Sequence, residues 1–173
     1  MPIPIEAYTA EGVLTGLCDA TGRLRDLLET LDAVRVAPCS ILPLHGEPRE
    51  RPEAIVQTDD LLLVVPVGTD PPVHATWHDI RVVVGPWRVD AVLAAQPGFD
   101  PGRALARPGG TFIALHDASV YRRMDPERPV ATHLDLLVDR YAVEEVECLL
   151  LLPFHFPGAT LRREAPSAVA PAH

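Results

Sequence analysis

Short runs in which apolar and polar residues alternate recur along the chain, and this period predicts β-strands. The plainest run is Thr111–Tyr121, in which the alternation is interrupted by a polar break at His116–Asp117. We interpret it as two strands joined at a tight corner. A similar run, Val34–Ile41, lies 79 residues upstream. The pattern therefore predicts two copies of one β-rich unit, each built around such a strand pair.

Further segments repeat on either side of this pair. A hairpin is predicted from the strands Ile3–Thr9 and Val13–Leu17. Its segments Ile5–Thr9 and Val13–Gly16 are echoed by Val73–Trp77 and Ile80–Val84. Polar loops are predicted at His45–Pro52 and Arg122–Pro129, and closing hairpins at Ala54–Gln57 with Leu61–Val67 and at Leu134–Val138 with Tyr141–Val146. The separation in sequence between matching segments of the two copies increases from 68 to 81 residues along the chain, as loops of different length would produce. We predict units at residues 1–68 and 72–156, an inserted loop at 96–110 and a disordered tail at 157–173.

One segment has a different period. Within Thr21–Leu31, leucines recur with the i, i+3, i+4, i+7 spacing of a helix face, and Asp19 or Thr21 is placed to cap the helix start. Nineteen prolines and eleven glycines leave little room for longer helices. The predicted fold class is mainly β, with tandem duplicated barrel- or sandwich-like units and one short helix, or α+β by strict count.

The first seventy residues resemble a bacterial family of small β domains. The resemblance rests on a hairpin ending in Gly16, the helix sequence RLRDLL at Arg23–Leu28, the strand pair Val34–Ile41 and a closing hairpin at Ile55–Val65. It implies a fold type. The family has no assigned activity, so it implies no functional residue.

Charge and composition narrow the function classes. The net charge is −9 and the sequence contains no Lys. Nucleic acid and anionic membranes both attract cations, so neither is predicted as a partner. The N-terminal residues lack the cationic start and apolar stretch of a signal peptide, and the longest apolar runs are too short to span a bilayer. We expect a soluble, cytoplasmic protein.

The spacing of the cysteines and histidines does not strongly predict a disulfide, a metal site or a catalytic pair. Three cysteines lie far apart with no CxxC pair, which disfavours a disulfide scaffold or structural zinc. The metal candidates are His74, His78, His116 and His133, but four residues along a strand separate His74 from His78 by about 13 Å. His116 and Asp117 are adjacent, so on a strand they face opposite ways.

Motifs that mark catalysis are also missing from the sequence. It contains no GxSxG elbow and no phosphate-binding glycine loop. We therefore predict no catalytic residue and no cofactor.

The apolar segment Cys148–Phe156 has no counterpart in the first half, and it is predicted as a final strand that something must cover. It either folds back as an internal clasp or pairs with another protein or a second copy of the chain. The predicted interaction residues are Leu150, Leu152, Phe154 and Phe156.

The preferred function is a non-catalytic binding, adaptor or assembly module that acts through protein–protein contacts. One alternative is a metal-dependent or histidine-based enzyme that uses the four candidate histidines. Another is a small-ligand sensor in which Trp77 and Trp87 line a pocket between the two copies.

Overall fold

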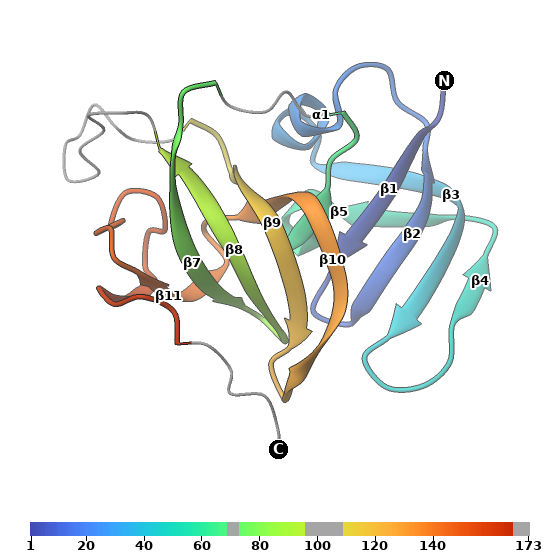
Figure 1. Cartoon of the computed structure of the whole chain (residues 1–173). Helices are drawn as coiled ribbons and strands as arrows, with labels where there is room; N and C mark the ends of the chain where they lie inside the picture. The colour runs from blue at the N-terminus through green and yellow to red at the C-terminus, as the bar shows by residue number, and fades with distance from the viewer. Residues whose placement is uncertain (69–72, 96–108, 168–173) are drawn as a thin grey trace. The chain divides into compact units, whose positions relative to one another are not determined.

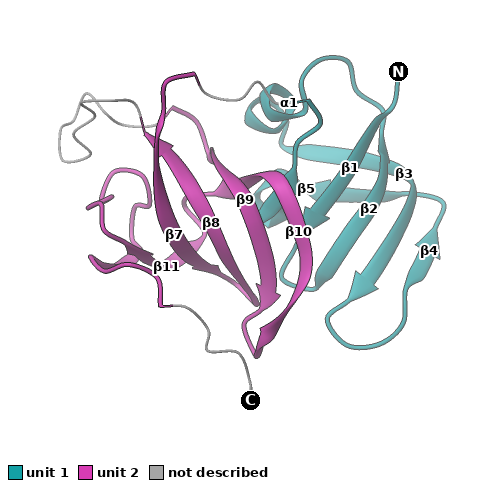
Figure 2. Cartoon of the chain, in the orientation of Figure 1, with its two compact units in different colours: residues 1–69 teal, residues 70–173 magenta. Residues whose placement is uncertain are grey.

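The computed structural model describes residues 1–68, 73–95 and 109–167 (Figure 1). The chain is mainly β: strands account for 58% of the described residues, and the α-helix among them has seven residues. The predicted fold class, mainly β with one short helix, is confirmed. The chain divides into two compact units, residues 1–69 and 70–173 (Figure 2). The division falls within residues 68–72, where a linker is predicted.

The first unit contains six strands and the helix. Its strands are β1 (Ile3–Tyr8), β2 (Gly12–Cys18), β3 (Ala33–Pro43), β4 (Arg49–Arg51), β5 (Ala54–Gln57) and β6 (Leu63–Val65). Their order is β6-β1-β2-β3-β4, and every pairing among them is antiparallel. β5 also pairs with β3, so one edge of β3 carries β5 along its first half and β4 along its second.

The second unit contains the remaining strands. They are β7 (Thr76–Val84), β8 (Trp87–Ala95), β9 (Phe112–Arg122), β10 (Asp125–Asp139), β11 (Val143–Cys148) and β12 (Thr160–Arg162). Their order is β12-β11-β7-β8-β9-β10. The β11–β12 pair is parallel and the others are antiparallel.

The two units share a connectivity. In each, the first two strands form a hairpin, the third pairs with the second, the next segment pairs with the third, and a later strand returns to the first. β10 is one strand of 15 residues, whereas the matching segment of the first unit is divided into β4 and β5. Within the described part of each unit, no pairing closes the strands into a barrel.

The predicted corner in each central strand pair is wrong. β3 and β9 are continuous strands of 11 residues, and each has a register shift against its neighbour near its middle. Such a β-bulge adds one residue and breaks the alternation, so the sequence pattern looks like the end of a strand. In β9 the bulge contains Asp117, whose φ is +47°. The polar break in the pattern is therefore a bulge.

The helix begins later in the sequence than predicted. α1 is Leu24–Thr30, and its N-cap residue is Arg23, which makes no side-chain capping bond. Neither Asp19 nor Thr21 is the cap, because Gly22, at φ +116°, lies between Thr21 and the start of the helix. The apolar face is partly confirmed, since Leu24 and Leu28 are buried.

The predicted closing hairpin of the first unit does not form. β5 pairs with β3 and β6 with β1, and the short 3₁₀ helix η1 (Thr58–Asp60) separates them. The Thr58 hydroxyl donates to the Leu31 carbonyl at 2.8 Å, and the Thr58 N–H donates to the Asp32 carbonyl at 2.9 Å. These bonds fix the crossing segment. The predicted loop His45–Pro52 also contains the short strand β4.

Strand pairing in the second unit also differs from the prediction. Val73–Trp77 and Ile80–Val84 do not form a hairpin, because Thr76–Val84 is one strand, which turns into β8 at Gly85. The predicted loop Arg122–Pro129 is largely strand, because β10 begins at Asp125. β11 pairs with β7 rather than with β10, so the second predicted closing hairpin is absent from the described pairings.

The C-terminal segment was predicted incorrectly at two points. Cys148–Phe156 is not a strand: β11 ends at Cys148, turns follow, and the Phe156 N–H donates to the Leu152 carbonyl at 3.3 Å. Pro153 has no amide hydrogen to continue a ladder. Part of the predicted disordered tail forms β12. Most of the predicted inserted loop at 96–110, and the end of the tail at 168–173, lie outside the described residues.

Large apolar side chains fill both units. Tyr8, Leu63 and Val34 are buried in the first unit, and Trp87 and Phe112 in the second. Each such side chain contributes about 1.5–3 kcal/mol when it leaves water. In the described part of the chain, no helix has the length and apolar character needed to cross a membrane.

Candidate functional site

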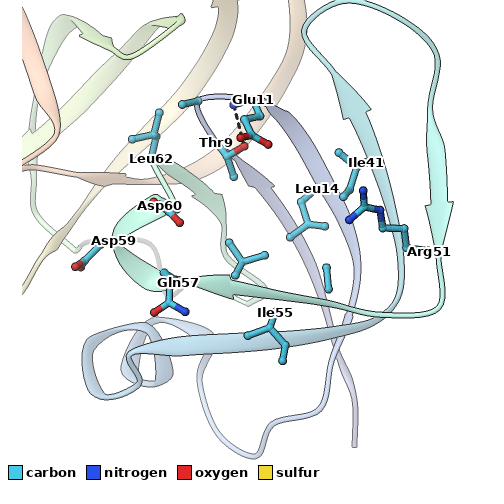
Figure 3. A pocket seen from close by; sticks show the side chains of 13 residues that line it. Thr9, Glu11, Leu14, Ile41, Arg51, Ile55, Gln57, Asp59, Asp60 and Leu62 are labelled. Atoms are coloured by element: carbon cyan, nitrogen blue, oxygen red, sulfur yellow. Dashed lines mark hydrogen bonds between the residues drawn. The ribbon is translucent and has the colours of Figure 1, made fainter.

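A pocket of about 390 Å³ opens in the first unit (Figure 3). Its walls come from the β1–β2 turn, from β2 and β3, and from the segment that runs from β4 through β5 and η1. Leu14, Ile41 and Val56 supply apolar surface. Pockets of roughly 300–1,000 Å³ with apolar walls and a few placed polar groups are typical of ligand sites.

Charged side chains surround this pocket unevenly. Glu11, Asp59 and Asp60 bring carboxylates, and Arg51 brings a guanidinium. Figure 3 shows Asp59 and Asp60 on one side of the pocket and Arg51 on the opposite side. Within the described residues, Asp59 and Asp60 form no ion pair. The pocket therefore offers an apolar floor with a predominantly negative rim.

The turn between β1 and β2 is held by its own hydrogen bonds. The Thr9 N–H donates to the Gly12 carbonyl at 2.8 Å. The Glu11 N–H donates to the Thr9 hydroxyl at 3.2 Å, a bond drawn in Figure 3. These bonds fix the backbone that carries Glu11 before any ligand arrives.

β5 forms the wall opposite this turn, and one edge of β5 has no strand paired with it in the described part of the first unit. It pairs with β3, and among the described residues no second strand of the first unit pairs with it. An unpaired edge presents N–H and C=O groups in the geometry that a further strand requires. Ile55 is 68% exposed on this strand. The pocket thus lies beside a strand that is able to accept another.

The sequence did not single out these residues. The pattern predicts turns at Ala10–Gly12 and Thr58–Asp60, a strand that ends at Thr9, and a loop that contains Arg51. The carboxylates come together because β6 returns to β1 while β5 stays on β3. That pairing leaves no local signal in the sequence.

The structure does not bring the four candidate histidines together. His74 is exposed in a turn with φ +59°, while His78, His116 and His133 are half-buried on β7, β9 and β10. Among the described residues, no group of three His, Cys, Asp or Glu side chains is arranged to hold a metal ion.

His116 pairs with a carboxylate that sequence reasoning missed. Its Nδ1 lies 2.5 Å from Oδ1 of Asp135, its cross-strand neighbour on β10. Asp117, the adjacent carboxylate, is exposed at the bulge. On its other side His116 meets the Trp77 indole edge-to-face, with the ring centroids 5.2 Å apart and the planes at 88°. The register of β9 and β10 creates this pair, although its members are 19 residues apart in sequence.

The two tryptophans occupy different environments. Trp87 is 1% exposed in the core, so it does not line an accessible pocket, whereas Trp77 is 49% exposed. A second, smaller pocket of about 200 Å³ lies beside Trp77. It is lined by Trp77, His78, Asp79, Leu149 and Ala165.

The four predicted interaction residues fall in two classes. Leu152 and Phe156 are 0% and 1% exposed, so the chain itself covers them. Leu150 and Phe154 are half-buried. These four side chains therefore do not form one exposed apolar face, and their role in an interaction stays a prediction.

A buried ion-pair network crosses the second unit. Arg81 donates to both carboxylate oxygens of Asp90, at 2.6 and 3.1 Å, and lies 3.4 Å from Glu147. Its guanidinium also donates to the Ser167 carbonyl at 2.7 Å. Arg88 contacts the same Asp90 carboxylate at 3.3 Å. Each charge has a partner, so we interpret this network as structural.

Buried titratable groups elsewhere are poorly suited to catalysis. Burial raises the pKa of the Cys18 thiol, and it also raises the pKa of Cys148, to which the Asp79 charge adds. Thiols with raised pKa values are weak nucleophiles at neutral pH. Burial, and then the Arg140 guanidinium, lower the pKa of His155 below its ordinary value. These groups are neutral parts of the core.

Comparison with protein-family models, with curated proteins and with solved structures gave no match for this chain. The resemblance carried by RLRDLL stays a prediction, and the function must be argued from the site itself.

Proposed function

We propose that this protein is a non-catalytic binding module that captures an extended segment of another protein in the pocket of its first unit. The observation that carries the proposal is the placement of a 390 Å³ pocket beside the unpaired edge of β5. An extended segment added to a sheet edge gains main-chain hydrogen bonds, and pockets beside the edge select its side chains.

The rim charges define the partner's chemistry. Three carboxylates face one guanidinium around the pocket, so a segment with Arg or Lys beside an apolar residue complements it. The apolar side chain enters between Leu14 and Val56, and the cation lies near Asp59 and Asp60. Charge complementarity of this kind raises the association rate and the specificity more than the affinity.

The shared connectivity of the two units supports a second part of the proposal, that they arose by duplication. The matched 11-residue strands β3 and β9 support it, since they retain the 79-residue offset seen in the sequence. The duplicated units then differ where β4 and β5 replace one long strand. We further propose a cytoplasmic location, which the three free, buried cysteines support.

The test is a selection from a random-peptide library on the purified chain, followed by calorimetric titration of the enriched peptides. We expect those peptides to share a basic residue beside an apolar one. Replacing Asp59 and Asp60 with Asn should weaken binding about threefold to tenfold, since exposed charge pairs contribute about 0.2–1 kcal/mol each. Replacing Glu47 and Glu50, which are exposed outside the pocket, with Gln removes the same charge and should leave binding unchanged.

A second variant tests the pocket itself. Ala54→Phe places a larger side chain in its wall and should weaken binding at least as strongly as the charge variant, without changing the unfolding midpoint by more than a few degrees. The proposal fails if no peptide is enriched, or if binding ignores both pocket variants. A dimer that A54F dissociates, measured by sedimentation, would instead identify a second copy of the chain as the occupant.

A further inference from the structure

The second unit carries a separate small pocket that the proposed docking site does not use. It lies along the first part of β7, before Ile80, where β11 no longer pairs with that strand. Leu149 and Ala165, from the segments that follow β11 and β12, close its outer side. The pocket measures about 200 Å³, the scale of one compact chemical group.

An aromatic ring in this pocket is exposed and yet fixed in place. Trp77 is 49% exposed, and its indole packs edge-to-face against His116, which Asp135 orients from the far side. This chain of contacts runs across the sheet from β10 through β9 to β7. A half-exposed Trp that is held by its neighbours offers a ligand a ring at little cost in side-chain entropy.

A carboxylate without an ion pair lies beside the ring. Asp79 is two residues from Trp77 on β7, so both side chains stand on one face of the strand, roughly 7 Å apart at their bases. In the described residues, the side chain of Asp79 forms no ion pair or hydrogen bond. Arg163, which lies near the same wall, donates to the Leu149 carbonyl at 3.1 Å. The pocket therefore combines a π-face, a negative charge and two apolar walls.

We propose that this pocket binds a methylated ammonium group. An ammonium within about 6 Å of an indole face is attracted by the ring quadrupole, and the Asp79 carboxylate adds charge attraction. A bare ammonium carries three strong donors and holds its water tightly, and of the lining side chains only Asp79 and His78 have atoms that can accept a hydrogen bond. A trimethylated, quaternary ammonium keeps the charge without any N–H donor, so it fits the walls better.

The test uses intrinsic fluorescence, because Trp77 is half-exposed and Trp87 is buried. Tetramethylammonium chloride is titrated against sodium chloride at equal ionic strength. A saturable change that disappears in Trp77→Phe is expected in the fluorescence of the native chain. By ligand NMR, Trp77→Leu should weaken binding about tenfold, within the range reported for cation–π contacts. Asp79→Asn should weaken binding severalfold, while Asp26→Asn, an exposed carboxylate on α1, should not.

Two further probes separate the outcomes. A neutral analogue, 3,3-dimethylbutanol, should bind at least about tenfold more weakly than choline, and equal binding would overturn the proposal because the contact would then be purely apolar. A blocked tripeptide with a central trimethyllysine is then compared with choline. Tighter binding of the tripeptide would identify a modified protein as the ligand, and tighter binding of choline would identify a free small molecule. If none of the cationic probes shows saturable binding, the proposal is overturned. This outcome does not depend on the result for the peptide site of the first unit.

Discussion

Removing the Asp90 carboxylate should destabilise the second unit by about 2–3 kcal/mol. A buried ion pair that loses one partner typically costs about 3–5 kcal/mol, because the remaining charge stays desolvated. Asp90 is 28% exposed and Arg81 is 10% exposed, and Arg81 keeps its contacts to Glu147 and Ser167. Both features lower the cost toward the smaller value.

The assay is urea unfolding of Asp90→Ala followed by tryptophan fluorescence, since both tryptophans lie in the second unit. Glu144→Ala is the matched control. It breaks a pair with Arg123 at 2.7 Å, close to the shorter Arg81–Asp90 distance, but both members are exposed, at 42% and 48%. The control should cost no more than about 1 kcal/mol. Equal losses in the two variants would refute the argument that burial, rather than distance, sets the cost.

Three further measurements test the core and its titration. Gly16→Ala should lower the free energy of unfolding by at least about 1–3 kcal/mol, because the new Cβ would overlap the backbone of β3. The control Gly109→Ala places its Cβ where no atom lies within 4 Å and should be neutral. The unfolding midpoints of the two variants test this difference. Leu152→Ala should cost about 2–5 kcal/mol because the side chain is fully buried, and it should leave the sedimentation mass unchanged. Because the pKa of His155 is lowered in the folded chain, its stabilising contribution is complete above the unfolded value of about 6.5 and is lost as the pH falls through the folded value. His155→Gln should therefore flatten the dependence of the unfolding free energy on pH between 5 and 7, and His45→Gln, at an exposed position, should leave it unchanged.

The strands could be predicted where alternation is regular. Ile3–Thr9 and Val13–Leu17 form β1 and β2 within a residue or two of the predicted ends, since each is a simple hairpin strand. Each central strand is predicted as two strands, divided at the position of its bulge. A bulge changes which residue faces inward, so the period that identifies a strand is lost exactly where the strand continues.

Pairing between distant strands was the harder problem. The hairpins predicted at residues 54–67 and 134–146 assumed that neighbours in sequence are neighbours in the sheet. In both units the later strand instead returns to the first strand. Nothing local in the sequence encodes this return, which depends on side chains such as Thr58 bonding to backbone 26 residues away.

The candidate sites depend on these same long-range pairings. The sequence drew attention to Trp77, but it placed Trp87, which is buried, in the same pocket and considered His116 with Asp117 and not with Asp135. The registers of β8 with β9 and of β9 with β10 decide both points. A site assembled across four strands therefore becomes visible only when the sheet order is known.

An interruption in one strand accompanies the pocket of the first unit. β10 pairs with β9 from Phe112 to Arg122, with register shifts beside Pro129, whereas Pro52 and Glu53 divide the matching segment into β4 and β5. Proline has no amide hydrogen to donate, so the ladder stops at that point. Arg51 and Ala54, on the two sides of the break, both line the pocket. The same connectivity thus gives one long strand beside β9 in the second unit, and two short strands with a recess beside the break between them in the first.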